Sequence, residues 1–191
     1  MDEDVPRAPP SPVARASVRL LAVCGSLQAR SANRTLLERA AELAPAGVEV
    51  HRFERLRDLP LFDPDLEANE APAPEPVQAW RAALSASDAL LIASPEYGHS
   101  LPGALKNAID WVIGSGELEE KIVAVTASTP GPERGRRGLE ALAVPLRAVR
   151  ATIVGGEPIG RGPGADAELA ALLGALLEAV RTTPRRPAML P

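Results

Sequence analysis

Short aliphatic runs, each followed by a polar loop and then by a helical pattern, constrain the fold of this chain more than any other feature. The first run, at residues 20–24, is long enough for a strand buried on both faces of a sheet. Similar runs occupy residues 88–93 and 122–125. Uninterrupted runs are typical of parallel strands, because the connecting helices cover both faces of the sheet. The pattern therefore predicts an α/β fold with a parallel sheet.

Two further strands and five helices complete this prediction. Residues 48–53 alternate like a strand with one more exposed face, and residues 151–154 form a short fifth strand. Helices are expected near residues 33–45, 77–87, 102–113, 136–149 and 166–181. Pro145 is expected to kink or interrupt the helix at 136–149. We predict one doubly wound α/β domain over 17–181, between a disordered leader at 1–16 and a flexible tail at 182–191.

Composition excludes several classes of function. A net charge of -4 argues against a general nucleic-acid binder, which would normally be basic. The single cysteine, Cys24, cannot form an intrachain disulfide and fits a reducing cytoplasm. The sequence shows neither a signal peptide nor an apolar run of the ~18 residues needed to cross a bilayer. No His, Cys, Asp or Glu cluster has metal-ligand spacing. We therefore expect a cytoplasmic protein with no metal, nucleic-acid or membrane partner.

The loop after the first strand, residues 25–33, has two interpretations. A strand that feeds a helix through a short polar loop aims backbone N–H groups and the positive end of the helix dipole at one point, which suits a phosphate. Ser26, Ser31 and Asn33 add neutral donors there, and Arg30 adds charge. The alternative is an ordinary strand-to-helix turn with a Ser or Asn N-cap. The loop lacks both the Walker and the GxGxxG patterns.

Two more polar, glycine-bearing loops follow the strands at 88–93 and 122–125. In doubly wound sheets, ligands bind beyond the carboxyl ends of the strands, where such loops meet. Tyr97 offers a ring that can stack on a flat heterocycle, and glycines allow close approach of the backbone. A phosphate tethered to a flat ring describes a mononucleotide, and FMN fits without a metal. Acid–base side chains are sparse, which favours chemistry performed by the cofactor over a catalytic side chain.

Three motifs resemble the NADPH-dependent FMN reductase family, which has the flavodoxin-like fold and includes chromate, quinone and azo-dye reductases. The motifs are GSLQARSAN at 25–33, LPLFDPDLE at 59–67 and SPEYGHSLPGALKNAIDWV at 94–112. The resemblance implies a five-stranded parallel sheet in the order 2-1-3-4-5, with helices on both faces. It implies an NAD(P)H oxidoreductase that passes hydride from NADPH or NADH to N5 of bound FMN. A small acceptor (flavin, quinone, azo dye or metal oxyanion) then takes the electrons.

The resemblance also assigns residues to the cofactor. It implies that Ser26, Ser31 and Asn33 hold the FMN phosphate, with Gln28 and Arg30 in the same cofactor-binding loop facing the phosphate or the pyridine nucleotide. It places Pro95, Glu96, Tyr97 and Gly98 along the ring and ribityl chain, and Ser128 and Gly131 beside the ring. The family usually has arginine where this chain has Gln28, and Arg30 is the candidate substitute. The family often has Asn-Gly where this chain has Gly98-His99. His99 then lies either in the substrate pocket or in solvent.

Two alternatives remain open from the sequence. Gln28 and the proline-rich third loop leave room for a catalytically weak FMN-binding or regulatory module. The resemblance further implies a homodimer or homotetramer with the helix at 102–113 at the interface. Ile109 and Trp111 would then be buried by a partner subunit, and burial within one protomer is the other interpretation.

Overall fold

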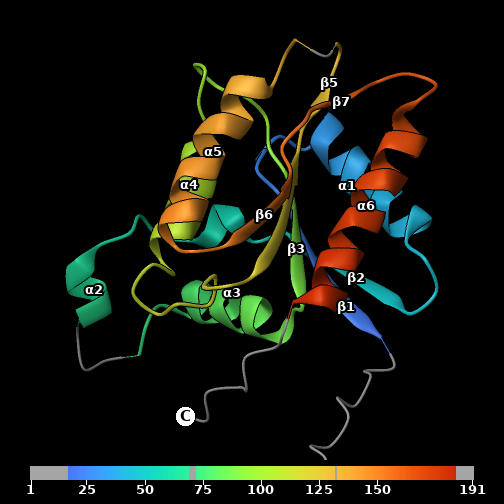
Figure 1. Ribbon diagram of the computed structural model, residues 1–191. Helices are drawn as coiled ribbons and strands as arrows, with labels where there is room; N and C mark the ends of the chain where they lie inside the picture. The colour runs from blue at the N-terminus through green and yellow to red at the C-terminus, as the bar shows by residue number, and fades with distance from the viewer. Residues whose placement is uncertain (1–16, 69–71, 132, 184–191) are drawn as a thin grey trace, which may run out of the picture.

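Five parallel strands form the central sheet, in the order β2-β1-β3-β4-β6 (Figure 1). The computed structural model describes residues 17–68, 72–131 and 133–183. The strands are β1 (Val18–Cys24), β2 (Val48–Phe53), β3 (Ala89–Ala93), β4 (Ile122–Thr126) and β6 (Thr152–Gly155). This order is the predicted 2-1-3-4-5, because β6 is the fifth strand of the sheet. The predicted leader, and the predicted tail from residue 184 on, lie outside the described residues.

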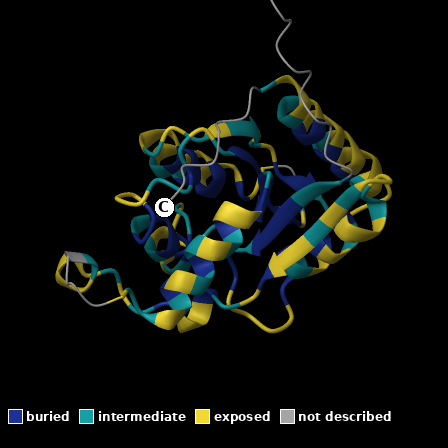
Figure 2. Ribbon diagram, turned by 90° about the horizontal axis from the view of Figure 1, so that it is seen from below, coloured by how far each residue is buried: buried dark blue, intermediate teal, exposed yellow. Residues whose placement is uncertain are grey.

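Helices cover both faces of the sheet, as Figure 1 shows. Helices α1 (Ala32–Leu43) and α6 (Ala165–Thr182) pack on one face. Helices α3 (Glu75–Ala86), α4 (Gly103–Asp110) and α5 (Arg136–Ala148) pack on the other, with the short elements η1 (Leu56–Asp58) and α2 (Pro64–Ala68) before α3. Alternate residues of one strand supply the two cores: Leu20 faces α1 and α6, and Leu21 faces the other layer. The central strands β3 and β4 are fully buried, whereas the edge strands β2 and β6 and the outer helix surfaces are partly exposed (Figure 2).

Two helices differ from the prediction. Helix α5 runs through Pro145 without a break. Leu142 and Leu146 are both fully buried, so their packing on the sheet holds the helix together on either side of the proline. Helix α4 ends at Asp110 and not near residue 113, because the N–H of Val112 bonds back to the carbonyl of Ile109 and tightens the chain into turns.

A second, two-stranded sheet lies beyond the main one and was not predicted. Strands β5 (Ser128–Thr129) and β7 (Ile159–Gly160) pair in parallel. The N–H of Ile159 also bonds to the carbonyl of Ala127, next to β5. This pairing holds the chain after β4 against the chain after β6, and so determines where the third loop begins.

The tryptophan that follows α4, Trp111, is buried within a single chain. Trp111 is 0% exposed and Ile109 1% exposed in the single chain. The indole N–H of Trp111 donates to the carbonyl of Pro60 at 2.8 Å. The Trp111 ring packs edge-on against the Phe62 ring, with the ring centroids 5.2 Å apart. The prediction that a partner subunit buries these two side chains is therefore wrong, and the alternative of burial within the protomer is confirmed.

Candidate functional site

The first loop leaves the start of α1 available to an anion. Ser31 is the N-cap residue, but its side chain makes no capping hydrogen bond, and the first turn of α1 contains no acidic residue. The first backbone N–H groups of a helix have no partner within the helix and carry its positive dipole end. Residues 25–33 contain no carboxylate. The side chains of Ser26, Ser31 and Asn33 are buried, so the loop presents uncharged hydrogen-bonding groups in fixed positions.

Two hydrogen bonds bring the three predicted loops together. Asn33 Oδ1 accepts a bond from the backbone N–H of Ser128 at 2.7 Å, across 95 residues of sequence. Ser26 Oγ lies 3.5 Å from the Tyr97 hydroxyl, across 71 residues. The first contact joins the loops after β1 and β4, and the second joins the loops after β1 and β3. The loops therefore meet at the carboxyl edge of the sheet, as predicted.

Tyr97 stands in a tight turn that presents its ring to solvent. The backbone groups of Tyr97 and Ser100 exchange two hydrogen bonds, each of 3.0 Å. Gly98 and His99 between them have φ of 58° and 61°, the left-handed pair that a two-residue turn needs. Glycine adopts this conformation freely, whereas histidine does so at some cost. The side chain of Tyr97 is 54% exposed and so is available to a planar ligand beside Ser26.

Both carboxylate oxygens of Glu96 are engaged by this chain. One lies 3.0 Å from His99 Nδ1, and the other accepts the N–H of Gly138 in the first turn of α5 at 3.0 Å. A Cβ at Gly138 would lie 2.9 Å from the Cβ of Glu96, so the contact requires glycine at that position. A contact from Glu96 to a ligand would thus come from its main chain. Its side chain instead ties the second loop to α5.

These contacts make the stability of the fold depend on pH through Glu96. The bond with His99, and then that from Gly138, lower the pKa of Glu96 in the folded protein. A carboxylate with a lowered pKa stabilises the folded state above its ordinary pKa, and the effect is lost as the pH falls through its folded pKa. We expect Glu96→Gln to unfold at lower urea concentration than the wild type at pH 7. The gap should narrow below about pH 4.

Urea unfolding of both proteins at several pH values, without added ligand, measures this difference. Glu140→Gln changes an exposed glutamate of α5 and is the matched control. A gap between Glu96→Gln and the wild type that stays constant from neutral to acid pH would contradict the prediction.

The other predicted residues lie around these contacts. The backbone N–H of Gln28 donates to Ser26 Oγ at 3.3 Å, whereas Arg30 is exposed. The carbonyl of Gly131 accepts the hydroxyl of Thr129 at 2.9 Å. Pro95 is half-buried, and His99 is exposed beside Glu96. The roles of these side chains toward a cofactor stay predictions.

Sequence reasoning missed a cluster of arginines beside the first loop. Arg57, just after β2, donates from Nη2 to the carbonyl of Leu27 at 2.6 Å. Arg34, in the first turn of α1, pairs with Glu54 at 2.8 Å. Both contacts could have been expected from the predicted strand order. Because β2 lies beside β1, charged residues that follow β2 lie near the loop that follows β1.

Within the described part of the chain, no group of three or more His, Cys, Asp or Glu side chains is placed to hold a metal ion. No helix there is both long and apolar enough to pass through a membrane.

Comparison with known proteins agrees with this geometry. The family model described as NADPH-dependent FMN reductase matches residues 18–161. A quinone reductase of Escherichia coli is 34% identical over 122 residues, which are 63% of this chain and 64% of that protein. A NAD(P)H-dependent FMN reductase of Pseudomonas aeruginosa is 36% identical over 121 residues, 63% of each chain. The matched part thus spans less than two thirds of the length of these two relatives.

A solved structure shares most of this architecture. The flavoenzyme NAD(P)H:(acceptor) oxidoreductase of Paracoccus denitrificans superposes with a TM-score of 0.75 at 26% sequence identity. The alignment covers 86% of this chain and 97% of that one. Family match, relatives and architecture point the same way: the chain belongs to the NADPH-dependent FMN reductase family.

Proposed function

We propose that this protein binds FMN at the meeting point of its three loops and is an NAD(P)H-dependent oxidoreductase. The observation that carries the proposal is the carboxylate-free first loop, which ends at the uncapped start of α1 and whose Ser26 lies against the hydroxyl of the exposed Tyr97. The first feature suits the phosphate of FMN, and the second suits its ring. The names of the two relatives and of the structural neighbour support the same activity.

In this proposal the chain binds and orients, and the cofactor reacts. When bound, FMN supplies the redox chemistry, accepting hydride from a reduced nicotinamide and returning electrons to a second substrate. Ser26, Ser31 and Asn33 hold the phosphate together with the first N–H groups of α1. Tyr97 borders the ring, and Glu96 holds the Tyr97 turn against α5. Positioning of the two substrates over one ring is the contribution of the protein to the rate.

Further parts of the proposal rest on the relatives. A quinone is the favoured acceptor, because one of the relatives is a quinone reductase. We also infer a homodimer or homotetramer in the cytoplasm. The exposed apolar side chains of Ile113 and Val144, near α4 and on α5, suit such an interface. The main alternative is a catalytically weak FMN-binding module, which the neutral Gln28 favours, since it removes a charge from the phosphate loop.

An absorbance experiment separates the two. Protein purified with added FMN is expected to show oxidised-flavin bands that bleach when NADPH is added without oxygen, and that return when a quinone is added. Bound flavin that neither NADPH nor NADH bleaches would favour the binding module. Failure to retain FMN at all would overturn both.

A further inference from the structure

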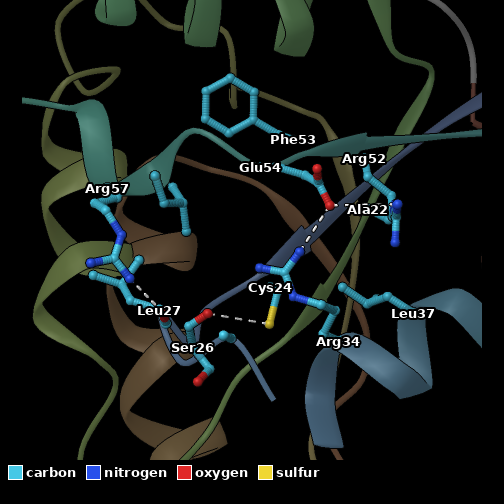
Figure 3. A pocket seen from close by; sticks show the side chains of 12 residues that line it. Ala22, Cys24, Ser26, Leu27, Arg34, Leu37, Arg52, Phe53, Glu54 and Arg57 are labelled. Atoms are coloured by element: carbon cyan, nitrogen blue, oxygen red, sulfur yellow. Dashed lines mark hydrogen bonds and ion pairs between the residues drawn. The ribbon is translucent and has the colours of Figure 1, made fainter. Parts of the chain in front are cut away.

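A pocket of about 220 Å³ lies at the edge of the sheet, between the first loop and the end of β2 (Figure 3). Ser26 and Leu27 of the loop form one wall, and Arg52 and Arg57, at and beyond the end of β2, form the opposite one. The sheet order places β2 on the far side of β1 from β3 and β4. The pocket is therefore on the side of the first loop away from Tyr97 and Ser128.

Positive charge dominates the pocket. Three guanidinium groups line it, from Arg34, Arg52 and Arg57, against the single carboxylate of Glu54. Glu54 lies 2.8 Å from Arg34 and 3.5 Å from Arg52. Arg57 donates instead to a carbonyl, that of Leu27, which carries no charge (Figure 3). In addition, Nε of Arg34 is buried without a hydrogen-bond partner in the described structure. Arg52 also pairs with Glu38, just outside the lining, at 2.9 Å, so Arg57 is the one guanidinium of the three without a carboxylate partner in the described structure. The three arginines and these two glutamates leave one positive charge in excess, which favours an anion at Arg57.

The interior of the pocket is apolar. Leu37, Phe53 and Leu56 line it, and each is almost completely buried. An apolar floor under a rim of guanidinium groups fits a ligand with a flat or aliphatic body and a dianionic group. Guanidinium groups bind phosphate through paired N–H donors and also stack on aromatic rings. The volume is below the roughly 300–1,000 Å³ of sites for drug-sized ligands. The pocket therefore suits one end of a larger ligand.

The proposed function requires a reduced nicotinamide dinucleotide, and this ligand has such an end. The nicotinamide of the dinucleotide must lie over the flavin ring near Tyr97. The other end of the dinucleotide is a purine nucleoside, on the far side of a pyrophosphate. Ser26 faces both places, because it lines the pocket and lies 3.5 Å from the Tyr97 hydroxyl. A dinucleotide that crosses the first loop at Ser26 would bring its purine end to the three arginines.

We propose that this arginine pocket binds the 2′-phosphorylated adenosine end of NADPH and so selects NADPH over NADH. The inference rests on the proposed reductase function and assigns its reductant. The 2′-phosphate meets Arg57 and Arg52, and the purine covers Leu37 and Phe53.

Direct binding tests the pocket without any turnover. FMN-saturated protein is titrated with 2′,5′-ADP, with 5′-AMP and with inorganic phosphate, by calorimetry. The expected result is that 2′,5′-ADP binds at least about tenfold more tightly than either of the others, since it alone places a phosphate and a purine together. Equal binding of the three would overturn the proposal. So would displacement of FMN by 2′,5′-ADP, because the pocket would then be part of the flavin site.

Arginine variants identify the residue that discriminates. Arg57→Ala is expected to lower 2′,5′-ADP affinity, and the ratio of kcat/KM for NADPH to that for NADH, by about tenfold or more. Arg57→Lys should restore part of both losses. Arg147→Ala, which removes an exposed charge from α5, should change neither. Equal loss for NADPH and NADH in Arg57→Ala would mean that Arg57 only holds the loop at Leu27, and would overturn the proposal.

The reductase function and the arginine pocket can be overturned independently of each other. Flavin that NADPH cannot reduce would overturn the reductase function whatever the titrations show. Flavin that NADPH and NADH reduce equally well, with no preference for 2′,5′-ADP, would overturn the arginine pocket and leave the reductase standing.

Discussion

Replacement of Trp111 by alanine is expected to lower the free energy of unfolding by about 3–5 kcal/mol, the usual loss for a buried Trp or Phe truncated to Ala. Trp111 is 0% exposed, so the cavity left behind would be enclosed. The change also removes the indole bond to the Pro60 carbonyl and the edge-on contact with Phe62. These contacts hold the loop before α2 against α4, so that loop should detach first.

Urea unfolding of matched variants measures this loss. Trp111→Phe keeps a ring but loses the N–H donor, and should cost about 1–3 kcal/mol because the part-buried carbonyl of Pro60 loses a partner. Asn107 also donates to that carbonyl, at 2.8 Å, which favours the lower part of the range. Leu61→Ala, at a side chain that is 83% exposed, should stay within about 0.5 kcal/mol of the wild type. A loss for Trp111→Ala as small as that for Leu61→Ala would show that Trp111 does not anchor the core.

Asn33→Ala is expected to weaken FMN binding by about tenfold to a hundredfold. The side chain is 5% exposed, and its Oδ1 accepts the Ser128 N–H at 2.7 Å. Its removal leaves that N–H without its partner, a cost of about 1–3 kcal/mol when such a group is buried. The link between the first and third loops is then lost on the same side of the site where the phosphate is proposed to bind. Fluorescence titration of the apoprotein with FMN measures the change.

Asn33→Asp separates the role of Asn33 in joining the two loops from its proposed role at the FMN phosphate. Aspartate keeps an acceptor for Ser128, so the loops stay joined, but it places a negative charge beside the proposed phosphate. FMN affinity should therefore fall while the urea midpoint of the apoprotein stays near that of the wild type. Gln78→Ala, which removes an amide that bonds to the Ala73 carbonyl on the opposite face, should change FMN affinity little. Normal FMN affinity in both Asn33 variants would place the phosphate elsewhere.

Much of the architecture was predictable from local pattern. The aliphatic runs at 20–24, 88–93 and 122–125 predicted three strands with both faces covered, and β1, β3 and β4 occupy those positions. Apart from Asp88, which precedes β3, the side chains of these runs are apolar and have no polar face to expose to water, so their burial follows from their own residues. The position of the polar loops was also predictable, because a loop that follows a parallel strand lies at the carboxyl edge of the sheet. The pairing of Lys106 with Asp110, four residues apart on α4, was predictable for the same local reason.

Other features depended on the tertiary structure. Pro145 disfavours a helix by its own chemistry, yet α5 is continuous because the buried neighbours of the proline pack on the sheet. The short strands β5 and β7 contain two residues each, too few for a sequence pattern to indicate. Gly138 admits the carboxylate of Glu96 only because its missing Cβ leaves space at the first turn of α5.

The sequence by itself therefore determined which segments are buried, the class of fold and the three loops that form the site. The tertiary structure decided which side chains meet: Asn33 with Ser128, Glu96 with Gly138, and Arg57 with Leu27. The physical reason lies in the range of the interactions. Burial and backbone preference are set by each residue and its near neighbours, and they repeat along the chain. A hydrogen bond of about 3 Å across 30 to 95 residues exists only after the sheet order has placed two loops side by side.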